Sequence, residues 1–222
     1  FLDDPDNNWT KLMGRIINEV NPNIVQTVFT NFLLNASIKG WGEIEKNREK
    51  YGHDIPFTIL VDPTTACNKK CIGCWAADYN KALNLSYEQL DKLFTEGKEL
   101  GIYFYIMTGG EPLVRKADIL KLAKKHNDCV FMFFTNGTLI DQKFCEDLID
   151  VGNLVPTISV EGFDDATDGR RGEGSWKDIM RAMDLMKSNR IPFGFSTCFT
   201  NANCDSVLSE EFIDLMIDKG AY

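Results

Sequence analysis

The 222-residue chain is short of positive charge. Its 24 Lys and Arg residues face 33 Asp and Glu residues, which gives a formal net charge of −9 at pH 7. The chain therefore lacks the basic stripe that neutralises a phosphate backbone, and we do not expect a nucleic-acid partner. Its apolar fraction of 44% and charged fraction of 26% are those of an ordinary globular domain.

The chain also lacks the marks of export. No stretch joins a basic start to a long apolar run and a small-residue cleavage site. Its seven cysteines are odd in number and unevenly spread, which argues against a secreted disulfide framework and favours free or metal-bound thiols in a reducing compartment. We therefore predict a cytoplasmic protein with no transmembrane segment. Because the chain begins at Phe1 rather than methionine, we also expect that it has been trimmed.

Residues 1–55 are predicted to form a helical extension. Apolar residues recur at helical spacing in NWTKLMGRIINEV and in NIVQTVFTNFLLNASI. Residues 41–56 are a charged segment that leads to the core. The second helix could lie on a membrane through its phenylalanines and leucines, but it has few basic residues to attract anionic lipid. Docking on the core is the better prediction.

Residues 56–222 are predicted to form an α/β core of parallel strands. Strand-like and helix-like segments alternate five times, which is typical of strands joined by helical crossovers. The expected strands are residues 57–62, 102–107, 130–135, 155–160 and 193–199, and the expected helices are residues 86–100, 117–126, 141–151, 175–189 and 206–220. This order predicts a partial (β/α) TIM-like barrel. The chain ends at residues 220–222, where a sixth strand is expected, so we predict a barrel that is truncated there.

Three cysteines follow the first predicted strand, in the segment CNKKCIGC. Cys67, Cys71 and Cys74 supply three soft thiolates with no fourth ligand nearby, which suits an iron–sulfur cluster or a catalytic zinc ion. A structural zinc ion would need a fourth ligand from His53, His126 or a distant cysteine. The spacing favours iron–sulfur over zinc, although a non-catalytic zinc module and an electron carrier stay open. The remaining cysteines are weaker candidates: Cys129 and Cys145 are expected to be buried thiols, and Cys198 and Cys204 flank the end of the fifth strand.

The other unusual segments follow the other four strands. They are TGGEP at residues 108–112, TNGT at residues 135–138, SVEG at residues 159–162 and STCFTNAN at residues 196–203. Ligand-binding residues of βα barrels lie at the carboxyl ends of the strands. We therefore expect all five segments to meet at one mouth.

The cysteine motif Cys-x3-Cys-x2-Cys, followed by Gly-Gly-Glu-Pro, resembles the radical S-adenosylmethionine (SAM) superfamily. The likeness continues through TNGTLI and ISVEGFDDATDGRRGEGSW, and it is strongest to the branch of molybdenum-cofactor, peptide-maturation and sulfatase-maturation enzymes. The resemblance implies a 4Fe-4S cluster on the three thiolates, with SAM chelating the fourth iron. It also implies an external one-electron donor such as flavodoxin or ferredoxin, and an oxygen-sensitive enzyme that generates a 5′-deoxyadenosyl radical for hydrogen abstraction. Peptide or protein maturation is the first expectation for the reaction, with a small molecule or lipid as the alternative substrate.

The same resemblance assigns SAM contacts to several residues. Carbonyls at Gly109 and Gly110 can accept hydrogen bonds from the SAM ammonium, with Glu111 adding negative charge and Pro112 stiffening the loop. The other expected contacts are Thr135, Asn136, Ser159, Glu161, Arg171 and Gly73.

The residues themselves leave some of these roles open. Arg171 has the planar fork that binds a carboxylate bidentately, whereas Glu161 could instead be a solvated charge. Thr135 and Asn136 could simply shape a turn. Gly73 stands where relatives often carry an aromatic residue, so Trp75 is the alternative stacking surface for adenine.

Overall fold

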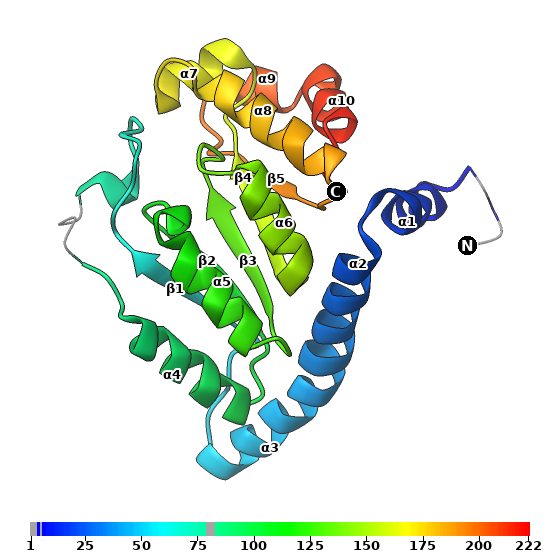
Figure 1. The fold of residues 1–222 in the computed structure, drawn as a ribbon, viewed down its shortest axis with the longest axis vertical. Helices are drawn as coiled ribbons and strands as arrows, with labels where there is room; N and C mark the ends of the chain where they lie inside the picture. The colour runs from blue at the N-terminus through cyan, green and yellow to red at the C-terminus, as the bar shows by residue number, and fades with distance from the viewer. Residues whose placement is uncertain (1–3, 5, 79–82) are drawn as a thin grey trace.

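The structure is a computed structural model that describes residues 4, 6–78 and 83–222. Five strands form one parallel sheet in the order β1-β2-β3-β4-β5 (Figure 1). They are β1 (Thr58–Thr64), β2 (Phe104–Gly109), β3 (Val130–Thr135), β4 (Leu154–Ser159) and β5 (Gly194–Ser196). The predicted α/β class is confirmed.

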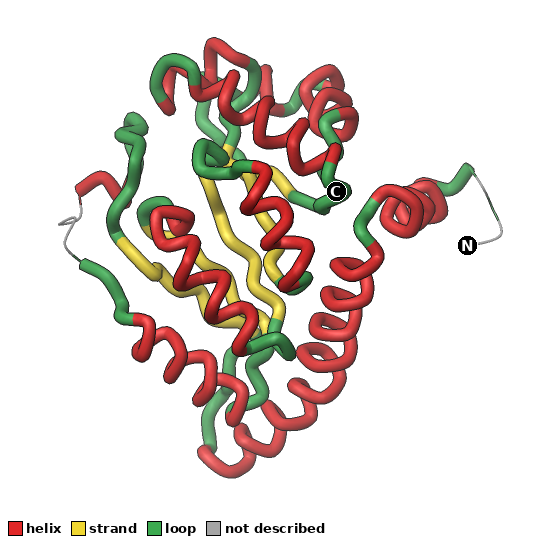
Figure 2. Tube along the Cα trace, viewed as in Figure 1, coloured by secondary structure: helices red, strands yellow, loops and turns green. Residues whose placement is uncertain are grey.

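Each strand is followed by a helix, and the linking helices cover one face of the sheet (Figure 2). They are α4 (Tyr87–Glu99), α5 (Lys116–Lys125), α6 (Gln142–Val151), α8 (Ser175–Ser188) and α10 (Glu210–Asp218). Several begin where the sequence supplies a cap. Ser86 and Gln89 form a capping box at α4, and the side chains of Asp141 and Ser209 accept backbone hydrogen bonds at the starts of α6 and α10.

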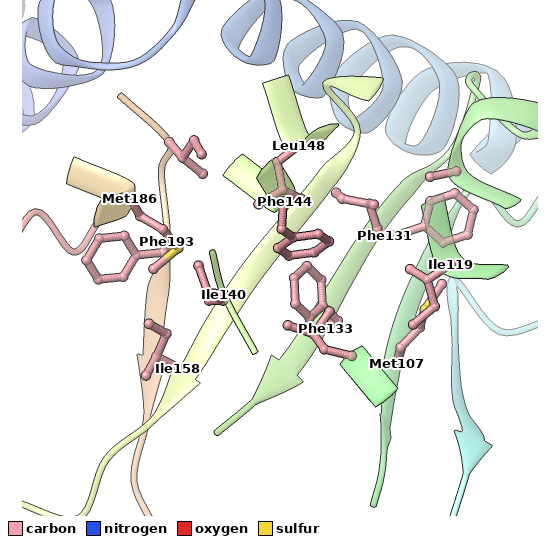
Figure 3. Packing of buried hydrophobic residues seen from close by; sticks show 14 of the residues in the cluster. Met107, Ile119, Phe131, Phe133, Ile140, Phe144, Leu148, Ile158, Met186 and Phe193 are labelled. Atoms are coloured by element: carbon pink, nitrogen blue, oxygen red, sulfur yellow. The ribbon is translucent and has the colours of Figure 1, made fainter. Parts of the chain in front are cut away.

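The alternation of side chains along the strands separates the core from the ligand side. Met107, Phe133 and Ile158 are fully buried with the helices, and Figure 3 shows Phe133 facing Phe144 of α6, with ring centroids 6.2 Å apart. Because successive side chains point to opposite faces of a strand, the next residue in each strand points the other way. Those residues are Thr108, Phe134 and Ser159, and all three line one pocket.

Four of the predicted strands are confirmed to within about two residues, but the rest of the core differs in three places. The fifth strand has three residues rather than seven, because residues 197–199 turn away and the Cys198 amide donates to Glu161 Oε2 at 2.9 Å. The last predicted helix is divided into α9 (Cys204–Val207) and α10. At the far end of the chain, Ala221 forms a parallel bridge with Phe193 beside β5.

The third difference is an additional helix, α7 (Asp164–Arg171), between β4 and α8. Its sequence, DDATDGRR, has no apolar stripe, so hydrophobic periodicity does not reveal it. Acidic residues lie in its first turn and Arg170 and Arg171 lie in its last turn, which matches the helix dipole. The Thr167 hydroxyl also donates to the Gly162 carbonyl at 2.8 Å, which ties the helix to the end of β4. Polar contacts rather than burial therefore hold α7.

The N-terminal extension is helical and packs against the core. It consists of α1 (Asn8–Glu19), α2 (Pro22–Phe29), the π-helix η1 (Thr30–Gly40) and α3 (Trp41–Tyr51), so the charged segment expected to be a connection is largely a helix. Figure 1 shows α2, η1 and α3 as one long continuous rod. Asn31 Nδ2 donates to the carbonyls of Asn127 and Cys129 at 2.7 and 2.9 Å, and Asn35 Nδ2 donates to that of Asp128. No helix within the described residues is long and apolar enough to cross a membrane.

Gly40, at the junction of η1 and α3, packs directly against the backbone of Gly101. A Cβ atom added to Gly40 would lie 2.4 Å from the Gly101 carbonyl oxygen and 2.9 Å from that of Asn35. Neither backbone oxygen can move aside cheaply, so we expect Gly40→Ala to lower the free energy of unfolding by about 1–3 kcal/mol. Gly42→Ala, two residues away, is the matched control because nothing lies within 4 Å of its added Cβ. Thermal unfolding of both variants tests this contact, and equal melting temperatures would contradict it.

Candidate functional site

A pocket of about 340 Å³ lies at the carboxyl ends of the strands, and segments after all five strands contribute to it. It brings together most of the site residues predicted from the sequence: Cys67, Cys71, Cys74, Gly109, Gly110, Glu111, Thr135, Asn136, Ser159 and Arg171. Pro112 is buried at the start of the 3-10 helix η3 (Pro112–Arg115) instead. Gly73 and Glu161 line a neighbouring hollow.

The three cysteines of the first loop face this pocket as partly buried, free thiols. Hydrogen bonds to residues outside the loop hold it in place. Its Ile72 amide donates to the Arg170 carbonyl at 2.8 Å, and Lys69 Nζ donates to Ser175 Oγ at 3.0 Å. Burial raises the pKa of the Cys67 thiol, so metal binding there must release a proton. The end of α7 and the start of α8 therefore position the cysteine loop.

The chemistry of the donor set decides which metal group the loop suits. In the described part of the chain, no three His, Cys, Asp or Glu side chains gather as ligands of a single metal ion. A four-iron cluster takes each thiolate on a different iron atom, so its ligands do not have to meet at one point. The three soft thiols belong to one loop and line one pocket, which fits such a cluster. The role of each cysteine stays a prediction.

The side chain of Glu111 links the ends of β2 and β3 through hydrogen bonds. Its carboxylate is 1% exposed and accepts hydrogen bonds from Thr135 Oγ1 at 2.8 Å, the Asn136 amide at 2.7 Å and the Leu113 amide at 3.0 Å. Burial raises the pKa of Glu111, and these hydrogen bonds oppose that rise. Asn136 Nδ2 also donates to Asn68 Oδ1 at 2.8 Å, which extends the network to the cysteine loop. Glu111, Thr135 and Asn136 thus shape the pocket from within.

The two glycines of the Gly-Gly-Glu-Pro segment allow it to pack against the chain before Cys67. Gly109 has a φ angle of 101°, and a Cβ atom on it would lie 2.6 Å from the Thr64 carbonyl oxygen. A Cβ atom on Gly110 would lie 2.2 Å from the Ala66 carbonyl oxygen. The Gly110 and Glu111 amides donate to these same carbonyls at 2.9 and 2.8 Å. Close backbone approach therefore requires glycine at both positions, even before a ligand is considered.

Glu161 is the centre of a buried ion-pair network, not a solvated charge. It is 1% exposed, and its Oε1 atom accepts from Arg170 Nη1 and from Arg171 Nε at 2.8 Å. Its Oε2 atom accepts a hydrogen bond from the Cys198 amide. Asn203 Nδ2 donates hydrogen bonds to the backbone carbonyls of Glu161 and Cys198. Two guanidinium groups share one carboxylate, so about one unit of positive charge is left for the pocket that both arginines line.

The pocket also contains Thr197, which sequence reasoning did not single out, and Cys198 and Trp75, which it named only as secondary candidates. The Thr197 hydroxyl is buried and has no hydrogen-bond partner within the described residues. Cys198 is exposed and adds a fourth thiol, although it was only a weak candidate in the sequence. Trp75, the alternative stacking surface considered in the sequence analysis, is 55% exposed there. Only its position in the STC segment could have pointed to Thr197, because a hydroxyl without a partner is visible only in three dimensions.

Comparison with known proteins agrees with this arrangement. The model of the radical SAM superfamily matches residues 61–209, so the chain belongs to that superfamily and the resemblance read from its motifs is confirmed. The mycofactocin maturase MftC of Mycolicibacterium smegmatis is 27% identical over 77% of this chain and 44% of its own length. The GTP 3′,8-cyclase of Petrotoga mobilis is 30% identical over 77% of this chain and 55% of its own length.

A solved structure supports the fold. SuiB of Streptococcus suis, bound to S-adenosylmethionine, aligns with 80% of this chain and 42% of its own chain at a TM-score of 0.66 and 18% identity. This likeness confirms the predicted partial barrel. The chain spans 35% to 59% of the length of the leading curated relatives that it matches.

Proposed function

We propose that this chain is the core of a radical SAM enzyme that binds a 4Fe-4S cluster and SAM in the 340 Å³ pocket. One observation carries the proposal: the three thiols of the cysteine loop share this pocket with the Gly-Gly-Glu loop and with Arg171. When bound and reduced, the cluster would supply the electron that cleaves a carbon–sulfur bond of SAM and yields the 5′-deoxyadenosyl radical. The protein binds, orients and shields the reacting groups.

The polar residues of the pocket are suited to the two ends of SAM. Carbonyls at Gly109 and Gly110 face the ammonium group in this proposal, and the charge left over at the arginine pair faces the carboxylate. Ser159 and the unpartnered Thr197 hydroxyl are available to the ribose hydroxyls. Trp75 offers an exposed ring near the thiols for adenine, while Gly73, with a φ angle of 67°, offers only backbone. Glu111, Pro112, Thr135, Asn136 and Glu161 act as positioning residues.

The substrate that we propose is a peptide or protein undergoing maturation. Support comes from the likeness to the mycofactocin maturase and from SuiB, which has also been solved bound to the precursor peptide SuiA. We also propose a cytoplasmic, oxygen-sensitive protein that receives electrons from a donor of the flavodoxin or ferredoxin type. Residues 1–55 form its docked helical extension and residues 56–222 form the radical SAM core.

A small-molecule substrate is the second candidate, because the GTP 3′,8-cyclase of Petrotoga mobilis is 30% identical to this chain. The chain has a net charge of −9, and the cationic side chains that line the pocket are Lys69 and the arginine pair. Incubation with GTP and, separately, with candidate peptides distinguishes the two, since consumption of one and not the other assigns the class.

Anaerobic reconstitution tests the proposed function. The protein is supplied with iron and sulfide, analysed for iron, sulfide and zinc, and then reduced in the presence of SAM. We expect iron and sulfide in near-equal amounts and formation of 5′-deoxyadenosine with methionine. A protein that takes up zinc in place of iron is instead a zinc module. A protein that holds a cluster but leaves SAM intact under every reductant is an electron carrier.

A further inference from the structure

A second cavity lies on the outer edge of β1, on the other side of Gly109 from the cysteine pocket. It has a volume of about 490 Å³, and its walls include Leu60, Asp62, Leu83 and Leu85. Leu60 is 61% exposed and Leu83 is 57% exposed, so apolar surface borders the cavity without being covered within the described residues. The site described above does not use this cavity.

An irregularity in β1 directs Asp62 toward this region. Val61 pairs with Met107 and Thr64 pairs with Gly109, so Asp62 and Pro63 together oppose the single residue Thr108. Such bulges re-aim side chains and often lie beside functional sites. A Cβ atom on Gly109 would lie 3.0 Å from Asp62 Cβ and 3.2 Å from its Cγ. The Asp62 carboxyl group therefore lies against the wall that separates the two cavities.

Asp62 is partly buried, and one oxygen of its carboxyl group lacks a hydrogen-bond partner. Its Oδ1 atom is buried without a hydrogen-bond donor, and no cationic side chain forms an ion pair with it in the described chain. Burial raises the pKa of Asp62. An acceptor left unsatisfied in this way costs stability, so its presence beside a cavity points to a ligand.

We propose that the cavity on the edge of β1 binds a primary ammonium group carried on a branched aliphatic body. The ammonium donates to Asp62 Oδ1, and the aliphatic body contacts Leu60, Leu83 and Leu85. A net charge of −9 favours a cationic ligand over an anionic one. In the proposed enzyme this cavity anchors the substrate next to the SAM pocket. That last step rests on the proposed function, whereas ammonium binding itself does not.

Titration with isoamylamine, followed by ligand-observed nuclear magnetic resonance, tests the proposal without SAM. Isoamylamine has six heavy atoms, so saturable binding on the order of millimolar is expected. Asp62→Asn keeps the size and shape but loses the charge, and it should weaken isoamylamine binding at least tenfold. Isoamyl alcohol, which lacks the charge, should bind both proteins equally weakly. Acetyl-Leu-Lys-Leu-amide distinguishes a peptide lysine from a free amine, because only a peptide site binds it more tightly than isoamylamine.

Two controls make each outcome decisive. Asp62→Asn removes the charge of a partly buried carboxyl group whose Oδ1 atom has no donor, and it should be at least as heat-stable as the parent protein, so a loss of binding is not a loss of fold. Leu60→Ala changes an exposed side chain and should weaken isoamylamine binding by several-fold. Equal affinity in the parent protein and Asp62→Asn, or no saturable binding in the parent, overturns the proposal. SAM cleavage, measured separately, shows whether the proposed function survives that result.

Discussion

Replacing Cys71 with alanine is expected to abolish both cluster retention and SAM cleavage. The cysteine loop offers three thiols to the pocket, and two thiolates cannot hold a four-iron cluster firmly. After anaerobic reconstitution and desalting, we expect little iron or sulfide on Cys71→Ala and 5′-deoxyadenosine formation no faster than without protein. Cys67→Ala and Cys74→Ala should behave alike, because each removes one of the same three ligands.

Cys204→Ala is the matched control for this experiment. Cys204 is partly buried at the start of α9, and its sulfur contacts Asn201 and Asp205 rather than the pocket. Its replacement should leave cluster content and SAM cleavage unchanged. The ligand assignment fails if Cys71→Ala retains a full cluster, and it is equally wrong if Cys204→Ala loses one.

Replacing Arg171 with alanine is expected to weaken SAM binding without affecting the cluster. A charge-assisted hydrogen bond to the SAM carboxylate is worth roughly 1.5–3 kcal/mol, which corresponds to a loss of about ten- to a hundredfold in affinity. Arg171→Lys should recover only part of the loss, since an ammonium group keeps the charge but not the two-pronged geometry. Ser159→Ala should cause a smaller loss in the same direction. Equilibrium titration of the reconstituted variants with SAM measures each effect.

The structure adds a competing effect to this prediction. Arg171 also pairs with Glu161, so its removal leaves the buried carboxylate with Arg170 and the Cys198 amide. Thermal unfolding of Arg171→Ala separates the two roles, because a purely structural residue would lower the melting temperature and leave SAM affinity intact. Arg48→Ala on the exposed surface of α3 should change neither quantity. Unchanged SAM affinity in a folded Arg171→Ala protein would reduce Arg171 to a partner of Glu161.

The sequence predicted the parts of the fold that depend on periodicity. The strands β1 to β4 are short apolar runs beside amphipathic helices, and the five motifs converge because the ends of parallel strands share one edge. Helix α7 and the short β5 could not be predicted in this way. Polar contacts at the end of β4 hold α7, and Glu161, 37 residues away in the chain, fixes the Cys198 amide where β5 ends.

The acidic residues show a different limit of sequence reasoning. The resemblance assigned Glu111 and Glu161 to SAM contacts, and the structure adds that internal donors contact both carboxylates. Apart from the Leu113 amide, which is two residues from Glu111, those donors are 9 to 37 residues away along the chain, so no local pattern reveals them. Asp62 is the opposite case. It looks like an ordinary residue of an edge strand, and only its buried, unpartnered oxygen distinguishes it.

The central claim is that the three thiolates hold a cluster whose open iron binds SAM directly. Electron–nuclear double resonance on the reduced, reconstituted protein tests it, with SAM labelled by oxygen-17 in its carboxylate. Direct binding predicts a changed electron paramagnetic resonance signal on addition of SAM and a measurable coupling to the labelled oxygen. A signal identical with and without SAM, in a protein that binds SAM by equilibrium titration, would contradict the account.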